Sequence, residues 1–282
     1  MTAGATGPLR ARPAAAGVLA LGGDVYVKRR TDAPDGFFEV EAAGLRWLAS
    51  VPGGARVVEP VEVGPDRLVL PRLPEVPPTA AAAAELGHRL AVTHAAGAPA
   101  WGAGPEGWTG DGYIGPLPLP MRPGPAWGPW FAEHRLLPYL RRAHDAGALD
   151  VEGSTTVARL LDRLVAEPDL AGPADELPAR LHGDLWNGNV MWTADGVVLV
   201  DPAAHGGHRE TDLAMLALFG LPHLSRVLDA YDEAAPLAPG WQDRVALHQL
   251  HPLLVHAALF GGGYGARAAA AAARYVGDRP RA

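Results

Sequence analysis

Residues 181–202, LHGDLWNGNVMWTADGVVLVDP, carry the strongest structural signal in this chain. Asp184 precedes Asn189, and Asp201 ends the apolar run VVLV that follows the turn residues ADG. Such a run after a turn predicts a strand, and catalytic groups are commonly held at strand ends and in the loops after them. The pattern therefore predicts two carboxylates and one amide around a single strand end.

These three side chains have the chemistry that phosphoryl transfer requires. The reaction needs a carboxylate that accepts the proton of the attacking hydroxyl, oxygen ligands for Mg²⁺, and a cation on the nucleotide phosphates. Asp184 fits the base, while Asn189 and Asp201 fit the metal ligands. Lys28, in the predicted strand DVYVKRR, fits the cation, and Glu41 on the following helix is its expected partner.

Composition gives these positions additional weight. Lys28 is the only lysine among 24 Lys and Arg residues, and Asn187 and Asn189 are the only asparagines. Abundant Gly, Pro, Ala and Arg indicate a GC-rich coding sequence, which replaces Lys and Asn wherever chemistry allows. Chance is the competing explanation for any single residue. A compact ammonium and a planar guanidinium are not interchangeable at a tight phosphate site, and Asn187 fits a turn before Gly188.

The bulk numbers exclude several classes of protein. A chain of 282 residues with 48% hydrophobic and 20% charged side chains suits a globular protein of one or two domains. A net charge of -7 argues against nucleic-acid binding, and no stretch approaches the roughly 20 apolar residues of a membrane span. A signal peptide at the N-terminus is a weaker alternative than a cytoplasmic location. A monomer is the expected state.

Periodicity predicts a bilobal α+β fold. A strand pair over residues 17–30, a helix over 35–50 and strands over 55–73 indicate a shortened, β-rich, nucleotide-binding N-terminal lobe, residues 1–72. The proline-rich segment 71–79 predicts a hinge. Residues 73–282 are expected to form a larger helical lobe with the catalytic loop, and a cleft between lobes is the default ligand site. Its predicted helices are residues 81–97, 127–147 and 155–168, with further helices after residue 210.

Longer motifs relate the chain to a known family. They are DGYIG, WFAEHRLLPYL, LHGDLWNGNV, VDPAAHGGHRETDLAMLALFG, AYDEAAPLAPGW and LLVHAALFGGGY. From about residue 24 to the end, the chain resembles the fructosamine-3-kinase or ketosamine-3-kinase family, which is aminoglycoside phosphotransferase-like and protein-kinase-like. The Asp-to-Asn spacing is also that of the protein-kinase catalytic loop. The resemblance implies a kinase-like fold and ATP-dependent phosphorylation of a ketosamine with Mg²⁺ as cofactor.

The family phosphorylates the O3 hydroxyl of sugar–amine adducts. The labile product then decomposes and frees the amine. On a protein, the overall result of these steps is deglycation. Carried over by position, the resemblance implies that Asp184 is the base and that Asn189 and Asp201 bind the metal. It implies that Lys28 forms the ion pair on the phosphates with Glu41, which has the family spacing, although Glu39 is also nearby. It also implies that two residues line the ketosamine pocket, Trp186 and His256.

Some of these residues have plainer explanations. His182 is expected to brace the catalytic loop by hydrogen bonds rather than to react. Asp212 is expected to hold the loop backbone or to cap its own helix. A tryptophan such as Trp186 is often a core residue, and His256 on an apolar helix is often a satisfied core histidine.

The small lobe departs from the family pattern. The turn over the phosphates is short, and Gly22 and Gly23 are the residues left to offer backbone amides to phosphate. Pro71 has no N–H to offer an adenine ring. These departures keep two alternatives open: a kinase for another small alcohol, such as an aminoglycoside, choline or a sugar, and an inactive pseudokinase. Bacterial-style composition favours ribulosamine or erythrulosamine over fructosamine.

Overall fold

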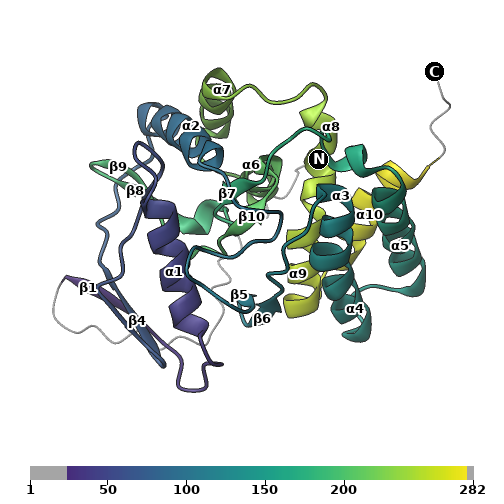
Figure 1. The fold of residues 1–282 in the computed structure, drawn as a ribbon, viewed down its shortest axis with the longest axis horizontal. Helices are drawn as coiled ribbons and strands as arrows, with labels where there is room; N and C mark the ends of the chain where they lie inside the picture. Colours follow the sequence, from purple (N-terminus) through teal and green to yellow (C-terminus); the bar gives the residue numbers. More distant parts are fainter. Residues whose placement is uncertain (1–23, 278–282) are drawn as a thin grey trace, which may run out of the picture.

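A computed structural model of the chain describes residues 24–277 and shows two parts of unequal size (Figure 1). The smaller part is an antiparallel sheet with one helix, and the larger part is mainly helical. This confirms the predicted bilobal α+β architecture. The first strand and glycine turn expected over residues 17–23, with Gly22 and Gly23, lie outside the described residues.

In the smaller part, a helix packs on a sheet of order β1-β4-β3. The helix buries Phe38, Ala42 and Leu45, whose spacing places them on one face. They pack against Leu68 and Leu70 of β4, where strand register sets Lys28 opposite Leu68. The elements are β1 (Val25–Arg29), α1 (Phe37–Ala49), β3 (Glu62–Gly64) and β4 (Arg67–Pro71).

The short strand β2 (Arg56–Val57) does not join this sheet, although the sequence suggested strands of the small lobe throughout residues 55–73. It pairs in parallel with β9 (Gly196–Leu199) of the larger part, and the Val58 N–H donates to Leu199 O at 3.0 Å. Pro60 follows closely and has no N–H to continue a ladder. The pairing ties the smaller part to the strand that leads into Asp201.

The larger part contains the remaining helices, which pack around two large apolar clusters. None of the helices within residues 24–277 has the length and apolarity that crossing a membrane requires. The α-helices are α2 (Ala80–Ala95), α3 (Trp127–Phe131), α4 (Leu137–Asp145), α5 (Val151–Ala166), α6 (Arg209–Phe219), α7 (Leu224–Ala234), α8 (Trp241–His248), α9 (Leu250–Phe260) and α10 (Tyr264–Val276). A short 3-10 turn, η2 (Pro168–Ala171), follows α5.

The helix expected over residues 127–147 contains a π-helical segment, η1 (Ala132–Leu136), between α3 and α4. Pro138 stands at the start of α4 and has no N–H for the hydrogen bond of a regular α-helix. A change of hydrogen-bond register before a proline is an ordinary cause of such a segment. Sequence periodicity alone did not predict it.

The predicted catalytic residues lie between short strands. β7 (Ala179–Leu181) leads into His182, and β8 (Val190–Thr193) and β9 form the hairpin that ends before Asp201. Two further elements were not predicted: β10 (His205–Gly207), which pairs with β7, and the hairpin of β5 (Gly112–Ile114) and β6 (Leu117–Leu119). These strands are short and rich in Gly and Pro, so they lack a strand-like pattern.

Helices α2 and α7 lie side by side at the top of Figure 1, and their contact depends on a glycine. A Cβ at Gly87 would lie 2.2 Å from Val227 O and 3.0 Å from Ala230 Cβ. The absence of a side chain therefore sets how closely the two helices approach.

We predict that Gly87→Ala lowers the free energy of unfolding by about 2 kcal/mol because the new methyl group forces α2 away from α7. Helix propensity alone predicts the opposite sign, a gain of about 1 kcal/mol. Urea unfolding monitored by circular dichroism measures the difference. The control is Gly263→Ala, where nothing lies within 4 Å of the added Cβ. A Gly87→Ala variant more stable than wild type would contradict the close-contact explanation.

Candidate active site

Lys28 lies between two carboxylates that come from different parts of the fold. Its Nζ is 2.7 and 2.8 Å from the two carboxylate oxygens of Glu41 and 2.9 Å from Asp201 Oδ1. Burial lowers the pKa of Lys28, but the charges of Glu41 and Asp201 outweigh it and the net pKa is raised. Lys28 therefore stays a cation. Through this ammonium, strand β1 and helix α1 are joined to the end of β9.

Glu41 is the partner of Lys28, as the sequence predicted, and Glu39 is not part of this contact. Burial and the Asp201 charge raise the pKa of Glu41, while the Lys28 ammonium lowers it. We take the pair as ionised because both carboxylate oxygens contact the ammonium at short distance. A buried lysine without such partners would tend to lose its proton.

The amide of Asn189 holds Asp184 and Asp201 close together. Its Nδ2 is 2.8 Å from Asp184 O, 3.2 Å from Asp184 Oδ2 and 3.4 Å from Asp201 O. Burial and the nearby Asp201 charge raise the pKa of Asp184 to about 7. A carboxylate with such a pKa is a better proton acceptor near neutral pH than an ordinary aspartate.

Asp201 has a backbone conformation that is rare outside glycine. Its φ is 56°, in the left-handed region. Such a residue persists only where surrounding contacts hold it, and these outliers gather at functional sites. Here the contact with Lys28 holds the side chain and the Asn189 amide approaches the carbonyl.

The donor set fits a magnesium ion. Asn189 directs its Nδ2 toward Asp184 and the Asp201 carbonyl, which leaves its carbonyl oxygen for a ligand. The Asp201 side chain is 43% exposed, and only its Oδ1 contacts Lys28. One anionic and one neutral oxygen, with room for waters and phosphate oxygens, is a usual protein contribution to a Mg²⁺ site.

Asp212 and His182 fix the backbone ahead of Asp184. The Asp212 carboxylate accepts hydrogen bonds from the His182 N–H at 2.7 Å and the Gly183 N–H at 3.0 Å. His182 donates from Nε2 to Val200 O at 2.9 Å and accepts from the Asp184 N–H at 3.3 Å on Nδ1. Burial lowers the pKa of His182, which agrees with this neutral tautomer. These are the bracing contacts that the sequence suggested.

The sequence did not identify His94 and Tyr231 as part of this arrangement. His94 Nε2 lies 3.2 Å from Asp212 Oδ2, and His94 Nδ1 lies 2.9 Å from the Tyr231 hydroxyl. His94 belongs to α2 and Tyr231 to α7, and both are buried. The signal that could have found them is a polar residue on the apolar face of a predicted helix, because a buried polar group needs a partner.

The two predicted substrate-side residues are linked through a third ring. Trp186 lies over Gly188 of the catalytic loop, where a Cβ would fall 2.4 Å from its ring atoms. The ring of Phe219, at the end of α6, lies 5.7 Å from that of Trp186 and 4.9 Å from that of His256 on α9. All three rings are half-buried. Trp186 and His256 therefore belong to one surface beside Asp184.

The hinge supports the expectation about Pro71. Pro71 ends β4 opposite Val25, and the next amide, Arg72 N–H, donates to Asp24 O at 2.9 Å. Further along, the Val76 N–H donates to Trp192 O at 2.8 Å, which holds the hinge against β8. An adenine ring would therefore have to bind a hinge amide other than those of Arg72 and Val76.

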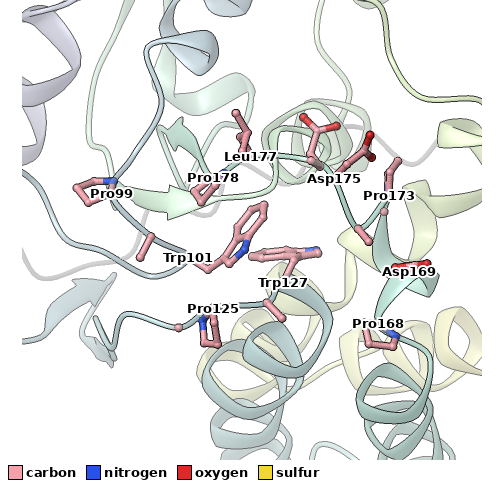
Figure 2. A pocket seen from close by; sticks show the side chains of 16 residues that line it. Pro99, Trp101, Pro125, Trp127, Pro168, Asp169, Pro173, Asp175, Leu177 and Pro178 are labelled. Atoms are coloured by element: carbon pink, nitrogen blue, oxygen red, sulfur yellow. The ribbon is translucent and has the colours of Figure 1, made fainter.

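A cavity of about 440 Å³ lies elsewhere, beside the Trp101 and Trp127 rings (Figure 2). Proline residues, Leu177 and exposed acidic side chains such as Asp169 and Asp175 surround it. None of the predicted site residues that the structure describes lines it. In this protein the chemistry of the side chains locates the candidate site better than cavity volume does.

One buried cluster among residues 24–277 resembles a metal site. His208, Glu210 and His248 bring ligand atoms within 4.8 Å of one another. Glu210, however, is paired by both oxygens with Arg244, at 2.5 and 2.9 Å. His208 Nδ1 accepts from the Glu210 N–H at 3.2 Å, so its remaining proton belongs on Nε2. The cluster is better explained as a buried ion-pair network.

We predict that Asp212→Asn lowers the free energy of unfolding by about 3 kcal/mol at neutral pH. The amide NH₂ of asparagine would face an N–H donor and leave buried donors unpaired. Urea unfolding measures the change. Asp229→Asn, at an exposed position of α7, is the control and should stay within about 0.5 kcal/mol of wild type.

The pH dependence tests the same contacts. Burial raises the pKa of Asp212, but the hydrogen bond and charge of His94 outweigh it, and the net pKa falls below the ordinary 3.8. The carboxylate therefore stabilises the fold above pH 3.8, and this contribution is lost as pH falls through the lower folded pKa. The difference between wild type and Asp212→Asn should shrink as pH falls below about 4. A difference that keeps growing below that pH would contradict the assignment.

The sequence of this chain is similar to those of known proteins. The sequence model of the fructosamine kinase family matches residues 15–277. The "probable ketoamine kinase" of Thermus thermophilus is 35% identical over 243 residues, which are 86% of this chain and 84% of that protein. Its counterpart in Enterococcus faecium is 32% identical over 244 residues, with the same two coverages.

Solved structures of other proteins are similar to this fold. A Thermobifida fusca protein named "putative fructosamine-3-kinase" has a TM-score of 0.82 at 52% identity, with 89% of this chain and 84% of that chain covered. The gentamicin complex of APH(2")-IIa has a TM-score of 0.57 at 10% identity, with 94% of this chain and 89% of that chain covered. The second likeness shows the protein-kinase-like fold alone. The family match, the relatives and the site together show that this chain belongs to the fructosamine kinase family and is a phosphotransferase with an alcohol group as acceptor.

Proposed function

We propose that the protein is an ATP-dependent ketosamine 3-kinase that phosphorylates the sugar O3 of fructosamine- or ribulosamine-type adducts and so starts their removal from amines. Membership of the family supports a ketosamine kinase, and the kinase-like fold implies that ATP is the phosphate donor. The observation that carries the proposal is the arrangement of Asp184, Asn189, Asp201 and Lys28, in which the Asn189 amide lies 3.2 Å from Asp184 Oδ2 and Lys28 Nζ lies 2.9 Å from Asp201 Oδ1. Phosphoryl transfer to a hydroxyl needs a base, metal ligands and a cation on the phosphates, and these residues would supply them.

The reaction follows from these positions. Asp184 accepts the proton of the sugar O3 hydroxyl while O3 forms a bond to the γ-phosphorus of ATP. The bond between that phosphorus and the bridging oxygen breaks, and ADP leaves with the electron pair. Lys28, kept cationic by Glu41, places positive charge on the nucleotide phosphates. Asn189 and Asp201 would hold Mg²⁺, which supplies charge neutralisation to the phosphates when bound.

The chemistry of the product explains how the amine would be released. Phosphate on O3 lies next to the C2 carbonyl, and it is a better leaving group than hydroxide. Enolisation toward C1 expels it, and hydrolysis of the remaining imine frees the amine. We favour ribulosamine or erythrulosamine over fructosamine from composition. A monomeric, cytoplasmic enzyme with an N-terminal lobe to residue 72 stays a prediction from the sequence.

We predict that Asp184→Asn lowers turnover by about 1,000-fold or more, because the amide cannot accept the hydroxyl proton, and leaves ATP binding nearly intact. Mass spectrometry of ribulose-, erythrulose- and fructose-lysine adducts incubated with ATP and Mg²⁺ measures product. Asp195→Asn, in the exposed turn between β8 and β9, is the matched control.

The outcomes separate the alternatives. Product with wild type and Asp195→Asn only would support the ketosamine kinase with Asp184 as base. Near-normal turnover of Asp184→Asn would contradict that role. ATP binding without product from any adduct would point to another alcohol acceptor. Failure to bind ATP would favour the pseudokinase alternative.

We also predict that Lys28→Arg lowers turnover by at least about tenfold although charge is conserved, because the planar guanidinium cannot occupy the position of the ammonium between Glu41 and Asp201. The comparison is Arg67→Lys on the neighbouring strand, whose surface pairing with Glu62 tolerates either cation. Steady-state kinetics with varied ATP measures both. A fully active Lys28→Arg would show that the lone lysine reflects chance.

A further inference from the structure

Aromatic side chains form a continuous surface that leads away from the catalytic loop, and we call it the aromatic path. Ring centroids are 5.7 Å apart from Trp186 to Phe219, 4.9 Å from Phe219 to His256 and 5.1 Å from His256 to Tyr264. Phe260 adds a ring 5.5 Å from His256 and is 52% exposed. The other four rings are half-buried, so the path is open to a ligand.

The tautomer of His256 leaves one ring nitrogen as a hydrogen-bond acceptor on the aromatic path. His256 Nδ1 lies 2.7 Å from Pro252 O, and a carbonyl oxygen only accepts, so Nδ1 carries the proton. Burial lowers the pKa of His256, and the ring is neutral at physiological pH. Nε2 is therefore an acceptor, suited to a donating hydroxyl such as that of a sugar. It lies two ring contacts from Trp186 in the catalytic loop.

A positive charge stands at the far end of the path. The Arg267 guanidinium carbon lies 5.7 Å from the Tyr264 ring centroid, one helical turn along α10. Arg267 is exposed, and no carboxylate of residues 24–277 forms an ion pair with it. Its charge also acts on His256. The path thus runs from the neighbour of the proposed base, over the aromatic rings, to a guanidinium that forms no ion pair within residues 24–277.

This order of chemistry matches one class of acceptor. A ketosamine of free lysine has a polyol at one end, a four-carbon stem in the middle and an α-carboxylate at the other end. Rings pack well against an aliphatic stem, and a guanidinium binds a carboxylate with paired hydrogen bonds. The step from His256 to Tyr264 is 5.1 Å, within the reach of an extended lysyl chain, and the Arg267 guanidinium carbon lies 5.7 Å from the Tyr264 ring centroid.

Resting on the proposed function, we propose that the preferred substrates are ketosamines of free amino acids, whose carboxylate Arg267 binds while the stem lies along Phe260 and Tyr264. A lysine within a protein has its carboxyl group in a peptide bond and offers no such anion. The path also disfavours polycationic acceptors, because Arg267 repels them.

The test compares two adducts of the same sugar, ribulosyl-lysine and ribulosyl-lysinamide, which differ in the charge of the carboxyl group. We expect kcat/KM to be about tenfold higher for the lysine adduct, which corresponds to about 1.4 kcal/mol. The carboxylate is far from the reacting oxygen, so the difference should appear in KM with similar kcat. Arg267→Ala should bring the ratio of the two kcat/KM values close to one.

The matched control is Arg274→Ala, an exposed arginine on the same helix, which should keep the wild-type ratio. Equal use of both adducts by wild type would overturn the inference while leaving the kinase function standing. An Arg267→Ala variant that keeps the wild-type ratio would overturn it as well. Phosphorylation of neither adduct would overturn the proposed function, and this inference with it.

Discussion

The contact of Lys28 with Glu41 and Asp201 is the interaction on which the rest of the site depends. It joins β1 and α1 of the smaller part to the end of β9, at distances of 2.7 to 2.9 Å. Three buried or half-buried charges are costly unless each has a partner, so the contact is stable only when both parts of the fold are correctly placed. The parallel pairing of β2 with β9 supports the same alignment. Together these contacts fix how the two parts of the fold are placed relative to each other.

A second, largely buried set of hydrogen bonds positions the catalytic loop. Asp212 binds the backbone ahead of Asp184, and His94 and Tyr231 bind Asp212 from α2 and α7. The close packing of these helices at Gly87 is therefore connected to the geometry of the loop. The raised pKa of Asp184 depends on this support, because a mobile carboxylate would gain solvent and lose the burial that raises its pKa.

Much of this could be predicted because its signals are local in sequence. The motif from residue 181 to 202 places Asp184, Asn189 and Asp201 around one hairpin, and a lone lysine before a helix with a glutamate indicated the Lys28–Glu41 contact. The pairing of β2 with β9, the π-helical segment and the role of His94 could not be predicted. Each depends on a partner far away in the chain, and no periodicity records such a partner. Likewise, Arg267 is an ordinary surface arginine until the fold brings Tyr264 and His256 beside it.

The measurement that tests the central claim most directly is phosphorus–proton correlation NMR of the product formed from ribulosyl-lysine and ATP. The account predicts a phosphorus resonance coupled to the proton on sugar C3, with one ADP formed for each sugar modified. This result would place the transferred phosphoryl group on the oxygen that Asp184 is proposed to deprotonate. Coupling to the protons of a terminal carbon, or inorganic phosphate as the first product detected with the adduct intact, would contradict it.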